Sequence, residues 1–457
     1  MATENLPNYL TAAKPNPMEN RAPWYKNIAP SYAGIFISVP FMAGMAGALQ
    51  FGSVWAGFIG LLIGALFCFM LYYVPGLLGF KTGMPLYVVG ASTFGTQGGI
   101  LMPGLLMGFL QIGWHAVFTV SAASFFMDAI GSEAGPNTGF FWLVCAVWGL
   151  AFAFVGAVGI SWLGWMSSWI PIFPLVAIVI AGFANMGGIG KFETAGEIAR
   201  SASIIPVLGL GAFAALQAAA GFFASAGAAG ADFTMNSRSP KDVVLGGFFG
   251  ITVAALVAGT FALFTIAGGM GNNPALAVSS GMVTGNLDII AAFSGSIGEV
   301  GGLSKIMFWV FVIACICPTG FCAFLAANSF STMFPKLPRV GMTMAAGIVG
   351  VILAATGVAN NLAGFFGLIG ASFGPIIGAM TADYIRSGGW SGPRKGINLA
   401  GYIAWGVGFL VGILGALPGI GFAYGLETLM SFIVGFSVYL IAAEMGLEPP
   451  KVELEKK

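Results

Sequence analysis

The stretch GIFISVP, from Gly34 to Pro40, stands in the middle of the first long apolar run of the chain, residues 29–50. A proline inside a helix removes a backbone donor and clashes with the preceding turn, so Pro40 predicts a break in this run. Broken backbone at membrane depth is tolerated only where it is buried in protein or lines a cavity. The stretch therefore indicates a membrane helix that is interrupted near its centre.

A second interruption is predicted in a later run, residues 203–235, where GFFASAG extends from Gly221 to Gly227. Its flanking glycines tolerate non-helical angles, and we expect unwinding near Phe222–Ser225. The two runs are the first and the sixth, and this odd offset inverts the second copy relative to the first. Interrupted helices in matching positions of inverted halves are typical of a midplane binding site. Kinked packing helices are the alternative interpretation of each break alone.

Composition places the whole chain in a membrane. Of its 457 residues, 58% are hydrophobic and 7% are charged, whereas a soluble domain carries about 25% charged residues to wet its surface. A bilayer core about 30 Å thick takes roughly 20 apolar residues per helix, which leaves room for about twelve spans. The formal net charge of +1 gives no indication of a nucleic-acid partner.

Polar breaks divide the chain into predicted spans, and the fold class that follows is an all-α integral membrane protein of about 12 transmembrane helices. The spans lie at residues 29–50, 54–78, 98–127, 140–159, 162–186, 203–235, 243–269, 303–330, 339–359, 361–386, 397–416 and 424–443. If the short break at Gly159–Ser161 were continuous helix, eleven spans would remain.

The arrangement of spans also predicts domains and orientation. The segments are an N-terminal tail (1–28), a first repeat (29–186), a second repeat (203–386), two further helices (397–443) and a C-terminal tail (444–457). With the N-terminus inside, all lysines and arginines except Lys191, Arg200 and Lys305 fall on the cytoplasmic side. Positive loops stay inside, so we expect a multi-pass protein of the cell membrane with both tails cytoplasmic.

The side chains indicate neither a metal cluster nor covalent catalysis. The trio Cys315, Cys317 and Cys322 lacks the paired spacing and the nearby histidine of a zinc site. With a single histidine and few charges, the chain offers no catalytic cluster at a membrane face, so we expect neither an enzyme nor a bound cofactor. A channel would need a polar lining sustained along several helices, and the runs do not supply one.

Four motifs, in order along nearly the whole chain, carry a family resemblance. They are GFKTGM at Gly79–Met84, QIGW at Gln111–Trp114, SAG with ADF between Ser225 and Phe233, and GP with ADY between Gly374 and Tyr384. By these motifs the sequence resembles the nucleobase–cation symporter family, most closely its cytosine permease branch. The resemblance implies a five-plus-five inverted-repeat fold with two extra C-terminal helices, and helices 1, 3, 6 and 8 around the substrate. It also implies secondary transport of a small planar solute, such as cytosine, a purine, hydantoin or allantoin, by alternating access.

Gln111, Trp114 and His115 are spaced i, i+3 and i+4, so they lie on one side of the predicted third helix. An indole stacks on the face of a base, and a glutamine amide reads a base edge with one donor and one acceptor. These types suit the planar cargo that the resemblance implies. A packing tryptophan, a glutamine that bridges helices and a histidine bonded to a neighbouring helix are the alternatives.

The interrupted runs supply further candidates. The resemblance aligns Phe223 with the position that stacks on the opposite face of the substrate ring. Unwound backbone around Phe222 and Ser225 would add free N–H and C=O groups, and Ser38 is an expected contact to the substrate edge. Phe222 is equally a candidate gate or core residue, since the chain has 41 phenylalanines.

A sodium site is implied by the resemblance, in a weakened form. Carried over, its ligands are the carbonyls of the first helix and groups on the eighth, namely Gly34, Ile37, Cys315, Pro318 and Thr319. Pro318 stands where sodium-coupled members have a hydroxyl, and losing an oxygen ligand weakens a site for a hard cation. Gly320, a candidate substrate position, stands where several members have asparagine. We therefore expect sodium or, as the alternative, a proton carried by His115.

Other assignments stay open at this stage. A proton-coupled amino-acid carrier of the same fold is the alternative cargo class, although such a site favours small residues over Trp114. Asp232 and Asp383 end the sixth and tenth spans, and we expect cationic partners for them such as Arg238 and Arg386. The sequence does not indicate the base, the oligomeric state or any protein partner, and the surrounding partner is membrane lipid.

Overall fold

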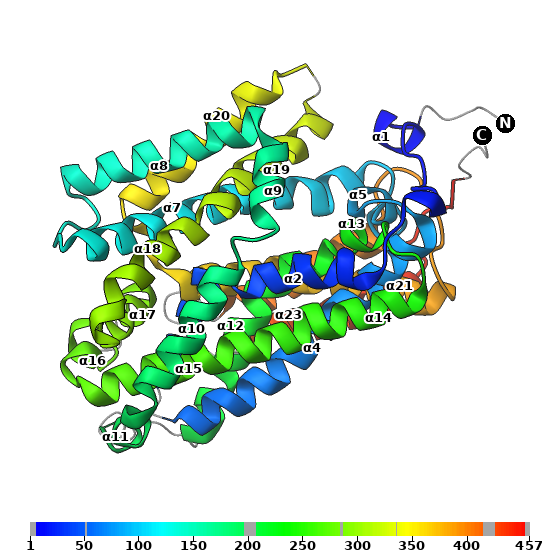
Figure 1. Ribbon diagram of the computed structural model, residues 1–457. Coiled ribbons are helices and arrows are strands. Elements are labelled where there is room, and N and C mark those ends of the chain that lie inside the picture. Colours follow the sequence, from blue (N-terminus) through cyan, green and yellow to red (C-terminus); the bar gives the residue numbers. More distant parts are fainter. Residues whose placement is uncertain are drawn as a thin grey trace.

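Long helices run side by side through the described part of the chain (Figure 1). The computed structural model describes residues 6–50, 53–195, 207–283, 287–334, 336–414 and 426–452. Every regular element in these ranges is a helix, which confirms the all-α expectation. The predicted boundaries at 203, 416 and 424, together with Arg200 and residues 453–457 of the predicted tail, lie outside the described residues.

Twelve membrane spans can be counted in these ranges. Nine stretches are long and apolar enough to cross a bilayer, and a tenth span is a helix pair bent by 52° at a short break. Of three shorter apolar helices, Arg339–Ala355 and Leu399–Ile413 match predicted spans and complete the twelve, whereas Ile289–Gly298 matches none. The fourth and fifth spans are separate, because helical geometry is interrupted at Gly159.

The spans follow in chain order with the following bounds. They are α2 with α3 (Ile28–Phe36, Val39–Leu49), α4 (Val54–Thr82), α7 (Leu106–Ile130), α8 (Gly139–Val158), α9 with α10 (Ile160–Ser167, Ile172–Asn185), α12 (Val207–Ala228), α14 with α15 (Pro240–Gly247, Ala254–Asn272), α18 with α19 (Ser304–Ala314, Ile316–Met333), α20 (Arg339–Ala355), α21 (Leu362–Ser387), α22 (Leu399–Ile413) and α23 (Glu427–Glu444). Short helices between spans include α5 (Leu86–Val89), α6 (Ala91–Phe94), α13 (Gly230–Thr234) and α17 (Ile289–Gly298).

Two of the longest spans begin and end on local sequence signals. The Ser53 side chain accepts a hydrogen bond from the backbone of Ala56 at the start of α4, and Asn361 caps α21 in the same way. Both helices end on a glycine with positive φ, Gly83 at 69° and Gly388 at 67°. Side-chain caps satisfy the first free N–H groups and a left-handed glycine ends the helix, so these boundaries are encoded locally.

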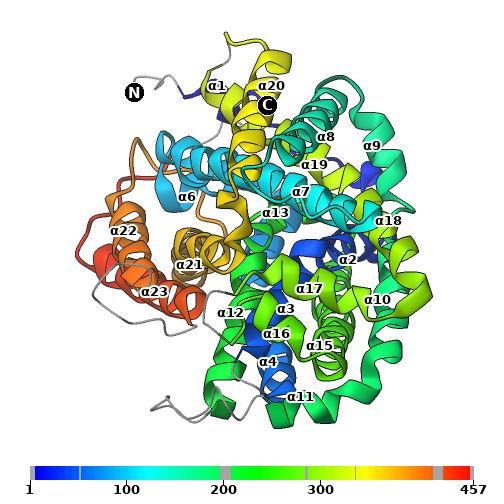
Figure 2. The same cartoon turned by 90° about the vertical axis from the view of Figure 1, so that its left-hand side faces the viewer.

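The spans pack in groups whose members are far apart in sequence. Helices α3, α4, α12 and α15 pack against one another, and α7, α8, α19 and α20 form a second group. In Figure 2, the second group lies above the first, and α21, α22 and α23 lie together at one side. Because α21 contacts both α12 and α7, the space between the groups is bounded by α3, α7, α12 and α21.

The predicted unwinding at Phe222–Ser225 is wrong. Helix α12 is continuous through these residues to Ala228, and the break comes at Ala229, before α13. The glycines have another purpose, since a Cβ at Gly221 would lie 2.5 Å from the carbonyl oxygen of Phe366 on α21. They allow close approach of helices, which is the usual use of small residues in membrane bundles.

Both tails lie at one end of the bundle, which we call the terminal face. The Tyr9 hydroxyl donates to the carbonyl of Thr96 at 2.7 Å, and the backbone N–H of Lys395 donates to Pro450 at 2.9 Å. Thr96 and Arg394 are themselves joined by a backbone hydrogen bond of 2.7 Å. An even number of spans places the two tails on the same side in this way.

A buried ion cluster holds the terminal face together. The Arg394 guanidinium donates to Asp383 at 2.9 Å and to Glu448 of the C-terminal tail at 2.8 Å. The expected partner of Asp383, Arg386, binds Glu448 instead. The expectation for Asp232 also differs, because its carboxylate accepts from the backbone N–H of Leu86 at 3.0 Å.

Removing Arg394 is expected to destabilise the protein. In Arg394→Ala, Asp383 keeps its buried position, with 3% of its side chain exposed, but loses its cation. Breaking a buried pair in this way costs about 3–5 kcal/mol, which should lower the thermal unfolding midpoint of the purified protein in detergent. Arg386→Ala is the matched control, because that side chain is 38% exposed and exposed pairs contribute about 0–1 kcal/mol. Equal midpoints for the two variants would contradict the assignment.

Candidate substrate site

The break in the first span is short, and no side chain caps either helix end at it. Helix α2 ends at Phe36, Ile37 has φ −83° and ψ 42°, and extended Ser38 precedes α3. Pro40 falls in the first turn of α3, where a missing N–H costs nothing because that group has no partner within the helix. The proline thus starts the second half of the span, and the predicted interruption at Ile37–Pro40 is confirmed.

The hydroxyl of Ser38 is a buried polar group without a partner. The residue is 8% exposed, and its Oγ makes no hydrogen bond in the described part of the chain. Leaving a buried donor unpaired costs about 1–3 kcal/mol. Such an atom at a helix break is available to a ligand that offers an acceptor or a donor.

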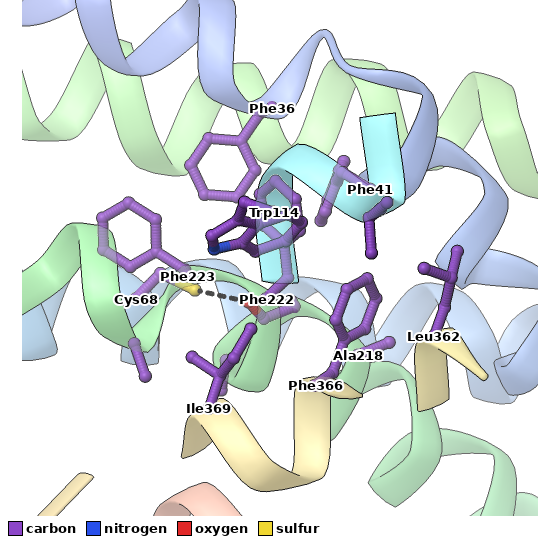
Figure 3. Packing of buried hydrophobic residues seen from close by; sticks show 14 of the residues in the cluster. Phe36, Phe41, Cys68, Trp114, Ala218, Phe222, Phe223, Leu362, Phe366 and Ile369 are labelled. Atoms are coloured by element: carbon purple, nitrogen blue, oxygen red, sulfur yellow. Dashed lines mark hydrogen bonds between the residues drawn. The ribbon is translucent and has the colours of Figure 1, made fainter. Parts of the chain in front are cut away.

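A cluster of aromatic rings surrounds this break, and Trp114 of α7 is its largest member (Figure 3). The indole contacts Phe222 of α12 edge to face, with ring centroids 5.3 Å apart. Phe36 and Phe41 lie on the two sides of the break and contact each other at 4.9 Å. Phe41 in turn contacts Phe222 at 5.2 Å, so the cluster joins α2, α3, α7 and α12.

Helix α21 adds two phenylalanines that the sequence analysis missed. The rings of Phe365 and Phe366 lie 5.1 Å and 6.0 Å from Trp114. Only the structure reveals them, because each ring fills a notch at a glycine of a facing helix. A Cβ at Gly113 would lie 2.6 Å from Phe365, and a Cβ at Gly44 would lie 2.9 Å from Phe366.

The structure brings some candidates together and separates others. Trp114 and Phe222 are in contact, whereas Phe223 stacks on Phe36 at 5.2 Å on another part of the cluster. Gln111 lies on the same helix, one turn before Trp114 and on the same side, and Ser225 is buried on α12, 5% exposed. The only described side-chain hydrogen bond of Gln111 is a long one of 3.5 Å to the Met107 sulfur, so its amide has bonding capacity to spare.

His115 faces away from the aromatic cluster. Its Nδ1 lies 2.9 Å from the carbonyl oxygen of Thr319 on α19, and its ring packs against Gly350 of α20. The residue is fully buried, and Nε2 has no partner among the described residues. Gly320 also faces elsewhere, because a Cβ there would lie 2.5 Å from Leu163 of α9.

The predicted sodium ligands do not form a ready cation site. The hydroxyl of Thr319 donates to the carbonyl of Cys315 at 2.6 Å, and the Trp148 indole N–H donates to the same hydroxyl at 3.4 Å. The Trp148 N–H therefore occupies a lone pair of the Thr319 oxygen that a cation would need, and Pro318 has no hydroxyl. On α2, Gly34 faces Pro171, whose Cγ would lie 3.8 Å from a Cβ at this position. This ligand set lacks one oxygen, and a second oxygen already accepts a hydrogen bond, so it would hold sodium only weakly.

Comparison with known proteins agrees with this arrangement. A family model described as permease for cytosine/purines, uracil, thiamine and allantoin matches residues 15–435. The allantoin permease of Bacillus subtilis is 24% identical, covering 93% of this chain and 90% of its own length. The cytosine permease of Escherichia coli K12 is 26% identical, covering 72% of this chain and 70% of its own length.

Solved structures give the same fold. The inward-facing conformation of Mhp1 has a TM-score of 0.72 at 16% identity, covering 99% of this chain and 97% of Mhp1. Mhp1 as a nucleobase-cation-symport-1 family transporter, closed with bromovinylhydantoin bound, has a TM-score of 0.63 at 16% identity over 97% and 95% of the two chains. This likeness confirms the predicted all-α membrane fold, with Mhp1 as a structural neighbour, whereas the division into two inverted repeats and two further helices stays a prediction.

Proposed function

Because the chain belongs to the family of permeases for cytosine/purines, uracil, thiamine and allantoin, we propose that it imports a nucleobase or a related planar heterocycle by alternating access. It is thus a transporter. The observation that carries the proposal is the position of Trp114, which lies between the two groups of spans, beside the broken first span. A site between groups that move relative to each other can face either side of the membrane in turn.

The proposed roles follow from the chemistry of each side chain. Trp114 supplies a flat face on which a base stacks, and the Gln111 amide pairs with donors and acceptors on the base edge. Ser38, buried with a free hydroxyl, adds a third contact from the first span. Phe222 forms part of the apolar wall around Trp114. Phe223 and Ser225 belong to the same part of α12 and hold it in place.

The amino-acid alternative is less well supported by this site. A carboxylate would need free backbone N–H groups or a cation, and the broken span presents only one short gap. The ring neighbours of Trp114 that the structure describes are all phenylalanines. Apolar walls with a few polar groups at the edge suit a neutral planar solute better than a zwitterion.

The terminal face is proposed to be the cytoplasmic side of the cell membrane. The lysines and arginines of the chain, apart from Lys191, Arg200 and Lys305, belong to that side in the twelve-span arrangement. Positive residues in short loops set the orientation of a membrane protein. Import would then carry the solute from the opposite face towards the ion cluster of Arg394.

The substrate role of Trp114 can be tested by binding. Trp114→Ala removes the stacking face and should weaken binding by about 1–3 kcal/mol, roughly one to two decades in Kd. Gln111→Ala should change which base is preferred more than Trp114→Phe does. Cytosine, uracil, purines, allantoin and hydantoins would be titrated against purified protein. Trp165→Ala is the control, since that indole is 61% exposed on the outer surface. Unchanged binding in both alanine variants at positions 114 and 111 would place the site elsewhere.

The coupling ion calls for a separate experiment. We propose weak coupling to sodium, because Pro318 supplies no hydroxyl and the Trp148 indole N–H, which donates to the Thr319 hydroxyl oxygen at 3.4 Å, must turn away before that oxygen can bind an ion. Uptake into proteoliposomes should then need high sodium, and Thr319→Val should remove that dependence. Thr343→Val is the control, a buried threonine on α20 with a similar bond to its own helix.

The competing proton model makes the opposite prediction. Uptake that ignores sodium, rises with an inward proton gradient and loses this response in His115→Gln would refute sodium coupling. Sodium-dependent uptake that His115→Gln leaves unchanged would refute the proton model.

A further inference from the structure

The indole of Trp114 has no open face for a substrate. It is 7% exposed, and four phenylalanine rings have centroids between 5.1 and 6.0 Å from it. A base can stack only on a ring face that is free. At least one of the four rings must therefore move before the proposed substrate binds.

Three of these rings are firmly held. Phe222 is 3% exposed and also contacts Phe36, Phe41 and Phe366. Phe366 is 2% exposed and fills the notch at Gly44. The third ring, Phe118, is 8% exposed and belongs to α7 itself, one turn beyond the indole. Moving any of these would open several contacts at once.

Phe365 is held least. It is the only one of the four that is not fully buried, and Trp114 is its only ring contact among the described residues. Its ring lies across Gly113, where a Cβ would be 2.6 Å away. Gly113 stands between Gln111 and Trp114, so Phe365 of α21 packs against the turn of α7 that carries both proposed substrate contacts.

We propose that Phe365, whose ring meets the indole at 76° with centroids 5.1 Å apart, fills the space beside Trp114 that a stacked base would need in the empty carrier, and that a base binds by displacing this ring. The inference rests on the proposed function. Phe365 is then a specificity-determining residue: its contact with Trp114 must be matched by any solute that enters, and a planar ring matches it best. A non-planar solute of equal size would leave the indole face partly uncovered.

Displacement gives Phe365 an effect opposite to that of an ordinary binding residue. Phe365→Ala should tighten the binding of a small base such as cytosine or uracil, by about two- to ten-fold, the range that one aromatic pair contributes. The tightening should appear in the association rate, because the competent state is populated more often. Phe365→Leu keeps an apolar side chain without a ring, so its affinity should lie between those of the parent protein and Phe365→Ala.

Gly113→Ala tests the same idea without changing the ring. The added methyl would occupy the notch and push Phe365 away, and alanine also suits a helix better than glycine. This variant should again tighten binding and raise the association rate. Leu368→Ala is the matched control, one turn along α21 and 46% exposed, and it should bind like the parent protein.

Stopped-flow quenching of tryptophan fluorescence by the base, with Trp114 present, gives both rate constants. A faster dissociation rate in Phe365→Ala would overturn the proposal, because it would make Phe365 a direct contact to the bound base. Unchanged binding in both Phe365→Ala and Gly113→Ala would also overturn the proposal, because Phe365 would then be an ordinary core residue. Trp114→Ala separates the two possible failures after such a negative result. If Trp114→Ala has lost binding, the proposed site stands and only the displacement model fails. If Trp114→Ala binds normally as well, the proposed site itself is wrong.

Discussion

The structure depends on one constraint: backbone N–H and C=O groups inside a bilayer must find partners within the protein. Nearly all of the described chain meets this constraint by being helical. The first span has the sharpest break among the described helix pairs, a bend of 52° that is kept to Ile37 and Ser38. Even there, Ile37 still donates to Ala33 at 2.9 Å and Met42 donates to Ser38 at 3.1 Å. The break survives because Phe36 and Phe41, both fully buried, shield it from lipid.

Glycine shows how far this arrangement could be predicted from sequence. Hydropathy and Pro40 are local signals, and they predicted the twelve spans and the first break. Gly221 and Gly227 were interpreted by the same local logic and predicted unwinding at Phe222–Ser225, where the helix is continuous. What decides between a break and a close contact is the neighbouring helix, here α21 against Gly221. A single sequence does not show which helix packs against a given glycine, so local signals could not have corrected this error.

The candidate site shows a similar division. Residue types and family resemblance predicted Trp114, Gln111 and Phe222, and the structure brings Trp114 and Phe222 into contact. Phe365 and Phe366 were missed, because nothing local separates them from the other phenylalanines of the chain. The partner of Asp383 was missed for a related reason. The neighbour on its own helix, Arg386, was expected, yet the buried cation comes from Arg394 in the following loop.

The direction in which His115 points follows from helix geometry alone. Adjacent residues on an α-helix point about 100° apart, since a turn takes 3.6 residues. Trp114 therefore faces α12 and α21, while His115 faces α19 and α20, where it lies 2.9 Å from the carbonyl of Thr319, 204 positions away in sequence. The contacts of Trp114 cross between the two groups of spans, and those of His115 stay within one group. A relative movement of the groups would change the surroundings of Trp114 and leave those of His115 intact. Trp114, the proposed substrate contact, and His115, which joins α19 to α7, are thus neighbours in sequence with different surroundings.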